Sequence, residues 1–479
     1  MKVADCSHHL RAQVKNAAGI LLVALLASGC AGTYKPANNA IDLIDEQSGY
    51  RAISEERLRS VGENVVVLAF SGGGTRAATL SYGVMQELRD TSVVVNGERV
   101  RLLDEVDTIS SVSGGSFTAA YYGVFGEQLF ETYEQDFLRQ SIQGILMKRL
   151  LSPAHWLKAL FSGFDRTEMA IDVYDRMVFK GATFADIPLD QRPYIEINAT
   201  DLAAGRRFSF TQERFDLLCS DLNEFSIARA VTASSAVPVA FSTVVLKNHA
   251  DRCDISQTRE WRLLNSMGTS DAQREQAEGL KSYRDAEQRP YIHLVDGGIS
   301  DNLGLRAAIE RIDTIGSEVF EPAAEHPPRN VLVILVNAEV KPDRVIEKTA
   351  KKPSVGATIG AFSGAQISRY TVETRDNLRR KAVELQLLAQ QNGWPTQVYF
   401  SEVSFADVPH KEASRFLNNL PTSLELDNTQ VDTLIATARI LLRRETEFQR
   451  FLERNEGELA ESAISEAEIC NYFKHERCE

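Results

Sequence analysis

Residues 109–117 read Ile-Ser-Ser-Val-Ser-Gly-Gly-Ser-Phe and mark a sharp turn between two regular elements. The residues before the turn, Glu105–Ser111, are rich in β-branched side chains, as in a strand. The residues after it, Phe117–Val124, carry apolar side chains at helical spacing. A serine at so tight a strand-to-helix turn, here Ser113, exposes its hydroxyl, and the glycines beside it let the backbones approach. The stretch predicts a nucleophile elbow, although a Ser/Gly-rich loop that caps a helix has the same local composition.

The composition is that of a globular protein. The chain has 479 residues, of which 43% are hydrophobic and 25% charged. Its length suits one large domain with insertions or several smaller domains. The formal net charge of −13 argues against nucleic acid as a partner and against attraction to anionic lipid. Association with a membrane therefore requires a means of attachment other than surface charge. The oligomeric state stays open.

The N-terminus provides such a means of attachment. Basic residues precede the apolar run Ala17–Ala27, which is too short to span a bilayer and is typical of a signal peptide. The run ends in Ala-Ser-Gly-Cys30, which resembles the lipobox of bacterial lipoproteins, although leucine is more usual than alanine at its first position. This resemblance implies removal of residues 1–29, a lipid such as palmitate on Cys30 and, with Ala31 next, an outer-membrane location facing the periplasm. An ordinary secretory signal cut near the same place is the alternative.

Four cysteines remain after the lipidated one and the one in the signal peptide. An even number in an oxidising compartment indicates disulfides. Any four cysteines allow three pairings, and loops that are short in sequence close most easily. We therefore favour Cys219 with Cys253 and Cys470 with Cys478. No Cys-x-x-Cys or His-x-x-x-His spacing occurs, so no metal site is expected.

The order of the expected elements indicates a layered α/β domain. Asn64–Phe70 is a nearly continuous apolar run, as in a strand buried on both faces, and it leads through a glycine-rich turn into a helix at Ala77–Arg89. A hairpin with its turn at Asn96-Gly97 follows. These units predict a mostly parallel central sheet with helices on both faces and with insertions. Further strands are expected at 194–200, 206–211, 291–295, 331–337 and 398–405, and further helices at 134–151, 167–178, 225–235, 365–391 and 431–450.

The chain divides by composition into four parts. Residues 1–29 are the signal peptide, and residues 30–60 are polar and mixed, as in a tether. Residues 61–450 form the globular domain. Within it, residues 247–290 are polar and lack periodicity, which indicates an insertion over the surface or a mobile cover. Residues 451–479 form an acidic tail that contains Cys470 and Cys478.

Three glycine-rich turns each follow an expected strand: Gly72–Gly74, Ser113–Gly115 and Asp296–Gly298. In doubly wound sheets, ligand sites form beyond the carboxyl ends of the strands. Three such turns at one sheet edge should therefore converge on one cleft.

The converging residues fit acyl transfer, which needs a nucleophile, a base and backbone donors for the oxyanion. Ser113 supplies the nucleophile and Asp296 the base. The donors are the amides of Gly72, Gly73, Gly74 and Gly114.

Other readings of these turns are weaker. A P-loop would continue with Gly-Lys-Ser/Thr, whereas the chain has Gly74-Thr75-Arg76. A plain tight turn without a catalytic role remains the alternative for Gly72–Gly74. A serine–histidine triad would need His293 to face the same site as Asp296 from three residues earlier in a strand, and the other histidines show no spacing signal. Asp301 is a second candidate for the base, or caps the helix that follows.

Four ordered motifs resemble the patatin-like phospholipases. They are Gly-Gly-Gly-x-Arg after the first strand, the elbow serine, a small-residue run before Pro238, and Asp-Gly-Gly. The resemblance covers about residues 64–305. It implies the patatin-like fold and a Ser–Asp dyad, with the nucleophile at Ser113, the base at Asp296 and the oxyanion hole at the glycine turn. The other motif positions are Arg76, as a structural or phosphate-side contact, and Gly115, Gly297 and Gly298.

One position departs from the family pattern, because Ser111 stands where Gly-x-Ser-x-Gly would begin. The leading hypothesis is a lipid-anchored phospholipase or esterase that acts on phospholipid or another acyl ester and requires no metal or cofactor. A catalytically silent lipid-binding or scaffold lipoprotein of the cell envelope is the alternative. Acyl transfer to an acceptor other than water cannot be separated from hydrolysis.

Overall fold

The computed structural model describes residues 36–52, 62–152, 165–238, 240–267, 271–309, 327–341, 346–348, 350 and 352–460. The expected signal peptide, Cys30, His326 and the pair Cys470 and Cys478 lie outside these residues.

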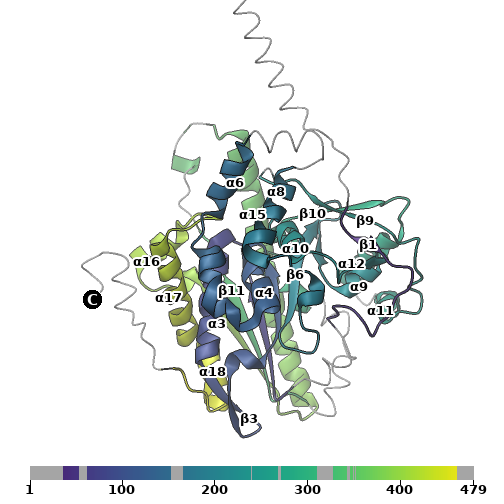
Figure 1. Ribbon diagram of the computed structural model, residues 1–479. Coiled ribbons are helices and arrows are strands. Elements are labelled where there is room, and N and C mark those ends of the chain that lie inside the picture. The colour runs from purple at the N-terminus through teal and green to yellow at the C-terminus, as the bar shows by residue number, and fades with distance from the viewer. Residues whose placement is uncertain are drawn as a thin grey trace, which may run out of the picture.

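An eight-stranded sheet forms the centre of the molecule, in the order β12-β11-β2-β5-β6-β10-β9, with β7 paired to β6 (Figure 1). The five strands from β12 to β6 run parallel, whereas β7, β9 and β10 are antiparallel to their neighbours. The mostly parallel sheet is confirmed. The strands are β2 (Asn64–Phe70), β5 (Val106–Val112), β6 (Tyr194–Asp201), β7 (Arg206–Ser209), β9 (Val244–Lys247), β10 (Tyr291–Val295), β11 (Asn330–Asn337) and β12 (Gln397–Ser404).

Helices cover both faces of this sheet. In β2 and β11, Leu68 and Ile334 join the larger core, while their neighbours Ala69 and Leu335 join a second core that includes Leu378 of α15. Such alternation buries both faces of a strand. α3, α4 and α17 lie in front of the sheet and α15 passes behind it (Figure 1). The bounds are α3 (Gly74–Asp90), α4 (Gly114–Phe125), α5 (Leu129–Tyr133), α6 (Ile142–Leu150), α8 (Arg166–Tyr174), α9 (Gln212–Asp216), α10 (Ile227–Ser234), α13 (Gly298–Asp301), α15 (Val355–Gln391), α16 (Lys411–Asn418), α17 (Asn428–Arg444) and α18 (Thr446–Arg454).

Most of the expected elements are confirmed to within a few residues. The hairpin β3 (Ser92–Val95) and β4 (Glu98–Arg101) turns at Asn96 and Gly97, both with positive φ. Two expected helices were wrong, because residues 134–151 are interrupted at residues 139–141 and residues 431–450 are divided between α17 and α18. The chain turns at Glu445, which has extended backbone angles (φ −63°, ψ 123°).

The described part of the expected tether packs against the domain. β1 (Asn39–Ala40) pairs with β8 (Ser220–Asp221), and Tyr50 is fully buried in the core. Arg51 forms a buried ion pair with Asp216, with 2.7 Å between Nη1 and Oδ2. The acidic tail likewise begins within the fold, because α18 continues to Arg454.

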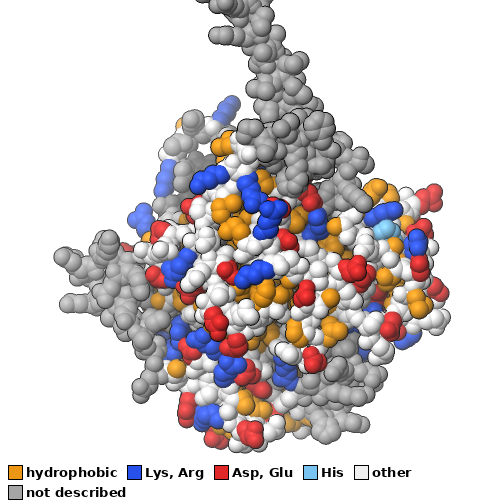
Figure 2. Space-filling model, in the orientation of Figure 1, with side chains coloured by type: hydrophobic (Ala, Val, Ile, Leu, Met, Phe, Trp, Pro, Cys, Tyr) orange, Lys and Arg blue, Asp and Glu red, His pale blue; other side chains and the backbone are white. Residues whose placement is uncertain are grey.

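The polar segment 247–290 contains two helices that were not expected, α11 (Arg259–Ser266) and α12 (Asp271–Lys281). They connect β9 to β10 beside the sheet (Figure 1). Cys219 and Cys253 form a disulfide that joins the start of this insertion to the domain. Acidic and basic side chains are interspersed over the face shown in Figure 2. Among the described residues, no helix is both long and apolar enough to cross a bilayer.

Candidate active site

Ser113 lies at the turn between β5 and α4, with φ 50° and ψ −118°. Positive φ is uncommon for a residue with a side chain and is typical of a functional turn. The turn requires glycine next in the chain, because a Cβ on Gly114 would lie 2.0 Å from the carbonyl oxygen of Gly74. Ser111, which stands where Gly-x-Ser-x-Gly would begin, is buried, and its hydroxyl donates to the carbonyl oxygen of Glu196 at 3.1 Å. The serine therefore fits without disturbing the elbow.

Ser113 and Asp296 are in direct contact. The Oγ of Ser113 donates to Oδ2 of Asp296 at 2.9 Å. Asp296 follows β10, which pairs with β6, and Ser113 follows β5 on the other side of β6. Residues 183 positions apart in the sequence are thus brought together by the strand order. Only 7% of Ser113 and 8% of Asp296 is exposed to solvent.

The environment of Asp296 suits a base. Burial raises the pKa of its carboxyl to about 6, opposed by hydrogen bonds from the backbone N–H of Gly298 and from Ser113. The Gly298 N–H donates to Oδ1 at 2.8 Å, which leaves Oδ2 directed at the serine. A carboxylate with a pKa near neutrality is a more effective proton acceptor than an ordinary aspartate.

The glycine-rich turn after β2 presents backbone N–H groups next to the elbow. Gly73 and Gly74 have φ of 145° and 63°, which only glycine adopts readily. Gly74 and Gly114 begin α3 and α4, where no intrahelical carbonyl can accept from their N–H groups. Within the described ranges, the Gly73 N–H also has no acceptor.

Gly72 was expected to be an oxyanion donor, and the structure differs. Its N–H donates to the carbonyl oxygen of Asn302 at 2.9 Å and is therefore already committed. A Cβ on Gly72 would meet the Asn302 side chain at 2.6 Å and the Cβ of Ser113 at 3.3 Å. Its role in the site is close approach to Ser113, and the available donors belong to Gly73, Gly74 and Gly114.

Ser234 stabilises the elbow through hydrogen bonds, a role that was not expected from the sequence. Its hydroxyl accepts from the N–H of Ser113 at 2.8 Å and donates to the carbonyl oxygen of Asn198 at 2.6 Å. Its own carbonyl oxygen accepts from the N–H of Gly297, beside Asp296, at 2.9 Å. One buried serine thus positions both halves of the pair. The sequence feature that could have indicated this role is the small-residue run before Pro238, which contains Ser234.

Arg76 is a structural residue. It is 2% exposed and donates to the carbonyl oxygens of Ala338 at 3.0 Å and Leu420 at 2.7 Å, and to the hydroxyl of Thr422 at 3.1 Å. Burial lowers the pKa of its guanidinium to about 10, so it stays charged at neutral pH. These contacts attach the start of α3 to two distant loops.

The other candidates for the base lie elsewhere. His293 is exposed on β10, and its Nδ1 is 3.0 Å from the hydroxyl of Thr243. His249 and His410, the other histidines of the described ranges, have no bond to Ser113 or Asp296. Asp301 accepts from the N–H of Arg306 at 2.8 Å, where the next helix begins. Across the described ranges, no three His, Cys, Asp or Glu side chains are grouped to hold a metal ion.

Comparison with known proteins adds a family match. The family model "Patatin-like phospholipase" matches residues 68–309, slightly more than half of the chain. Human GIVD cytosolic phospholipase A2 is a structural match with a TM-score of 0.36 and 13% sequence identity. The match covers 63% of this chain and 51% of that chain, so this protein spans about half the length of that structure. No curated protein sequence matches the chain.

Proposed function

This chain belongs to the patatin-like phospholipase family, and from that premise we propose that it is a serine acyl hydrolase of phospholipid or another lipid ester. Ser113 is the nucleophile and Asp296 its base. The observation that carries the proposal is the 2.9 Å hydrogen bond from the Ser113 hydroxyl to the Asp296 carboxylate. No histidine is needed, because Asp296 contacts the hydroxyl directly.

Acylation of Ser113 is the first half of the proposed reaction. Its Oγ attacks the ester carbonyl carbon while its proton moves to Oδ2 of Asp296. The oxyanion that forms accepts hydrogen bonds from the N–H groups of Gly73, Gly74 and Gly114, which stabilise the developing charge. The C–O bond to the alcohol breaks, and the oxygen of the departing alcohol takes this proton from Asp296.

Deacylation uses the same groups in reverse. Asp296 accepts a proton from a water molecule as the water oxygen attacks the acyl carbon on Ser113. The bond to Oγ breaks, the fatty acid leaves, and Oγ recovers the proton from Asp296. A carboxyl pKa of about 6 suits both steps, since the group must accept and then return a proton near neutrality.

Labelling with a fluorophosphonate, followed by hydrolysis of a panel of lipid esters, tests the assignment. Wild type should be labelled and active, and Ser113→Ala should lose both properties. Asp296→Asn should lower both by about a hundredfold or more, since general-base catalysis contributes about 10²–10⁴-fold. Ser81→Ala is the matched control. Ser81 is buried in α3, and its hydroxyl has no partner among the described residues.

Labelling that persists in Ser113→Ala would refute the assignment. Wild type that folds and binds lipid but neither labels nor hydrolyses any ester would support the catalytically silent alternative instead.

We also propose that the enzyme is a lipoprotein of the cell envelope, attached through a lipidated Cys30 and facing the periplasm. The support is the sequence Ala-Ser-Gly-Cys30 after an apolar run. Cys30→Ala should release the protein from membranes and prevent metabolic labelling with palmitate. Unchanged membrane retention of that variant would contradict the proposal.

A further inference from the structure

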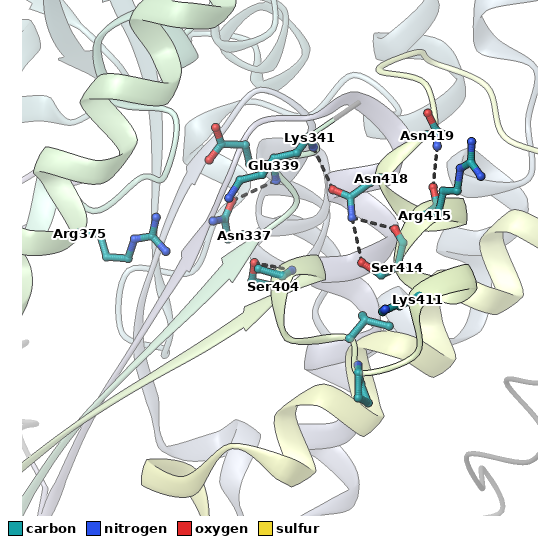
Figure 3. A pocket seen from close by; sticks show the side chains of 13 residues that line it. Asn337, Glu339, Lys341, Arg375, Ser404, Lys411, Ser414, Arg415, Asn418 and Asn419 are labelled. Carbon is teal, nitrogen blue, oxygen red and sulfur yellow. Dashed lines mark hydrogen bonds between the residues drawn. The ribbon is translucent and has the colours of Figure 1, made fainter. Parts of the chain in front are cut away.

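A polar pocket lies at the same sheet edge as the Ser113–Asp296 pair. It has a volume of about 410 Å³ and opens at the carboxyl ends of β11 and β12, with β2 separating β11 from β5 (Figure 3). Neither Ser113 nor Asp296 lines it. α15 and α16 form the remaining walls, and the proposed hydrolytic reaction makes no use of the pocket.

Positive charge dominates the pocket lining. The only carboxylate among the lining residues is that of Glu339. Glu402 lies behind the wall and pairs with one of the lining arginines at 3.2 Å. In a chain with a net charge of −13, this concentration of cations is a local feature and favours an anion. The cationic side chains are Lys341, Arg375, Lys411 and Arg415.

Several of the lining residues come from one helix, α16. Lys411, Arg415 and Asn418 are spaced four and three residues apart along α16, so they share one face of the helix. Asn418 is itself locked, because its Oδ1 accepts from the N–H of Lys341 at 2.9 Å and its Nδ2 donates to the carbonyl oxygen of Ser414 at 2.7 Å. Ammonium and guanidinium groups that line one pocket from three segments can contact the several oxygens of a phosphate group.

Hydrogen bonds connect the chain beside the pocket to the segment that carries the proposed oxyanion hole. Ala338, between two lining residues, donates its N–H to the hydroxyl of Ser71 at 2.8 Å and accepts from Arg76 at 3.0 Å. Leu420, two residues beyond the end of α16, also accepts from Arg76, at 2.7 Å. The pocket and the glycine turn are thus joined through Ser71 and Arg76.

We propose that this pocket binds a phosphate-bearing anion at a site separate from Ser113. The phosphate group belongs to a lipid headgroup or to a soluble phosphate compound, and both present the same charged oxygens to the four cations.

Thermal unfolding of the full chain in increasing inorganic phosphate, with ionic strength held constant by chloride, tests the proposal. Wild type should show a saturable rise in Tm. The double variant Lys411→Gln/Arg415→Gln should bind phosphate at least about tenfold more weakly, since two charge-assisted contacts are lost. Lys247→Gln is the matched control, because Lys247 is an exposed lysine on β9 at the opposite edge of the sheet. It should bind as wild type does.

A second variant gives an effect of opposite sign. Glu339→Gln removes the carboxylate that repels the anion and should tighten phosphate binding by about fivefold, the size expected for one nearby charge at high effective dielectric. Weakening in one variant and tightening in the other cannot both arise from misfolding. An absence of saturable stabilisation in wild type, or equal affinity in all variants, would overturn the proposal.

Vesicles distinguish the two sources of the phosphate. Vesicles with phosphatidic acid in phosphatidylcholine should bind wild type more tightly than phosphatidylcholine alone, and the double variant should lose that difference, if a lipid headgroup fills the pocket. Equal binding to both vesicles, together with retained inorganic phosphate affinity, would assign the pocket to a soluble phosphate compound.

Discussion

At the scale of single residues, Asp296 shows a conflict between stability and the proposed chemistry. Its carboxyl is 8% exposed, and burial raises its pKa from 3.8 to about 6. Desolvation of a charged group destabilises the fold, whereas a raised pKa makes the same group a better base. The hydrogen bonds from Gly298 and Ser113 offset part of that destabilisation.

This pKa sets the expected pH dependence of activity. Asp296 must be ionised to accept the proton of Ser113, so kcat/KM should rise with pH through about 6 and level off above it. The profile should be measured with an ester that carries no group titrating in this pH range. A rising limb near pH 4 would show that the base has an ordinary carboxyl pKa.

The same shift predicts that Asp296→Asn stabilises the protein while removing activity. Because the folded pKa lies above the unfolded value, the folded state binds more protons between about pH 4 and 6, and wild-type stability falls as pH rises through that window. The variant lacks this fall. Above pH 6 it should be more stable by up to about 3 kcal/mol, the equivalent of a shift of roughly two pKa units.

Denaturant unfolding of Asp296→Asn at several pH values measures the difference. Exposed Asp190→Asn is the control and should show no comparable change between pH 4 and 6. A variant whose stability relative to wild type is the same at pH 4 and pH 7 would contradict the prediction.

At the scale of elements, Arg76 holds the glycine turn in place. Its three hydrogen bonds connect the first turn of α3 to Ala338 beyond β11 and to the loop beyond α16. The N–H of Thr75, the preceding residue, also donates to that loop, at the carbonyl oxygen of Ser423 (2.9 Å). The turn's geometry therefore depends on residues more than 250 positions away in the sequence.

Arg76→Lys should lower both stability and turnover. A lysine cannot reproduce the planar guanidinium contacts, and the carbonyls left unpaired should reduce the free energy of unfolding by about 3 kcal/mol. kcat should fall more than KM changes, since displaced oxyanion donors act on the transition state. Arg89→Lys, on the same helix with a partly exposed side chain, should change stability by less than about 1 kcal/mol. Equal effects of the two variants would contradict this role for Arg76.

The elements that carry the candidate site were predictable because their signals are local. β2 and β10 were expected at the bounds that they have, since an apolar run followed by glycine identifies a buried strand and its end. Other features depend on distant partners. The two-residue strand β1 has no periodicity of its own and exists through its pairing with β8. The role of Ser234 likewise depends on the strand order that brings it to Ser113.

At the scale of the whole molecule, the polar insertion between β9 and β10 is fastened to the domain at its start. The disulfide joins Cys219 to Cys253 across 34 residues. Arg284, near the end of the insertion, donates to the carbonyl oxygens of Cys253 at 2.8 Å and Leu217 at 3.3 Å. Asp296 follows directly after β10, so this fastening stabilises the connection that leads to the proposed base.

Cys219→Ala/Cys253→Ala should therefore lower the free energy of unfolding by about 4 kcal/mol, the loop-closure value for a bridge of this span. A reductant should lower wild-type stability by a similar amount and leave the double variant unchanged, which separates loss of the bridge from loss of packing. Fluorophosphonate labelling in native buffer should persist in the variant, because the contact between Ser113 and Asp296 does not pass through the bridge. Loss of labelling at unchanged global stability would instead show that the insertion itself positions Asp296.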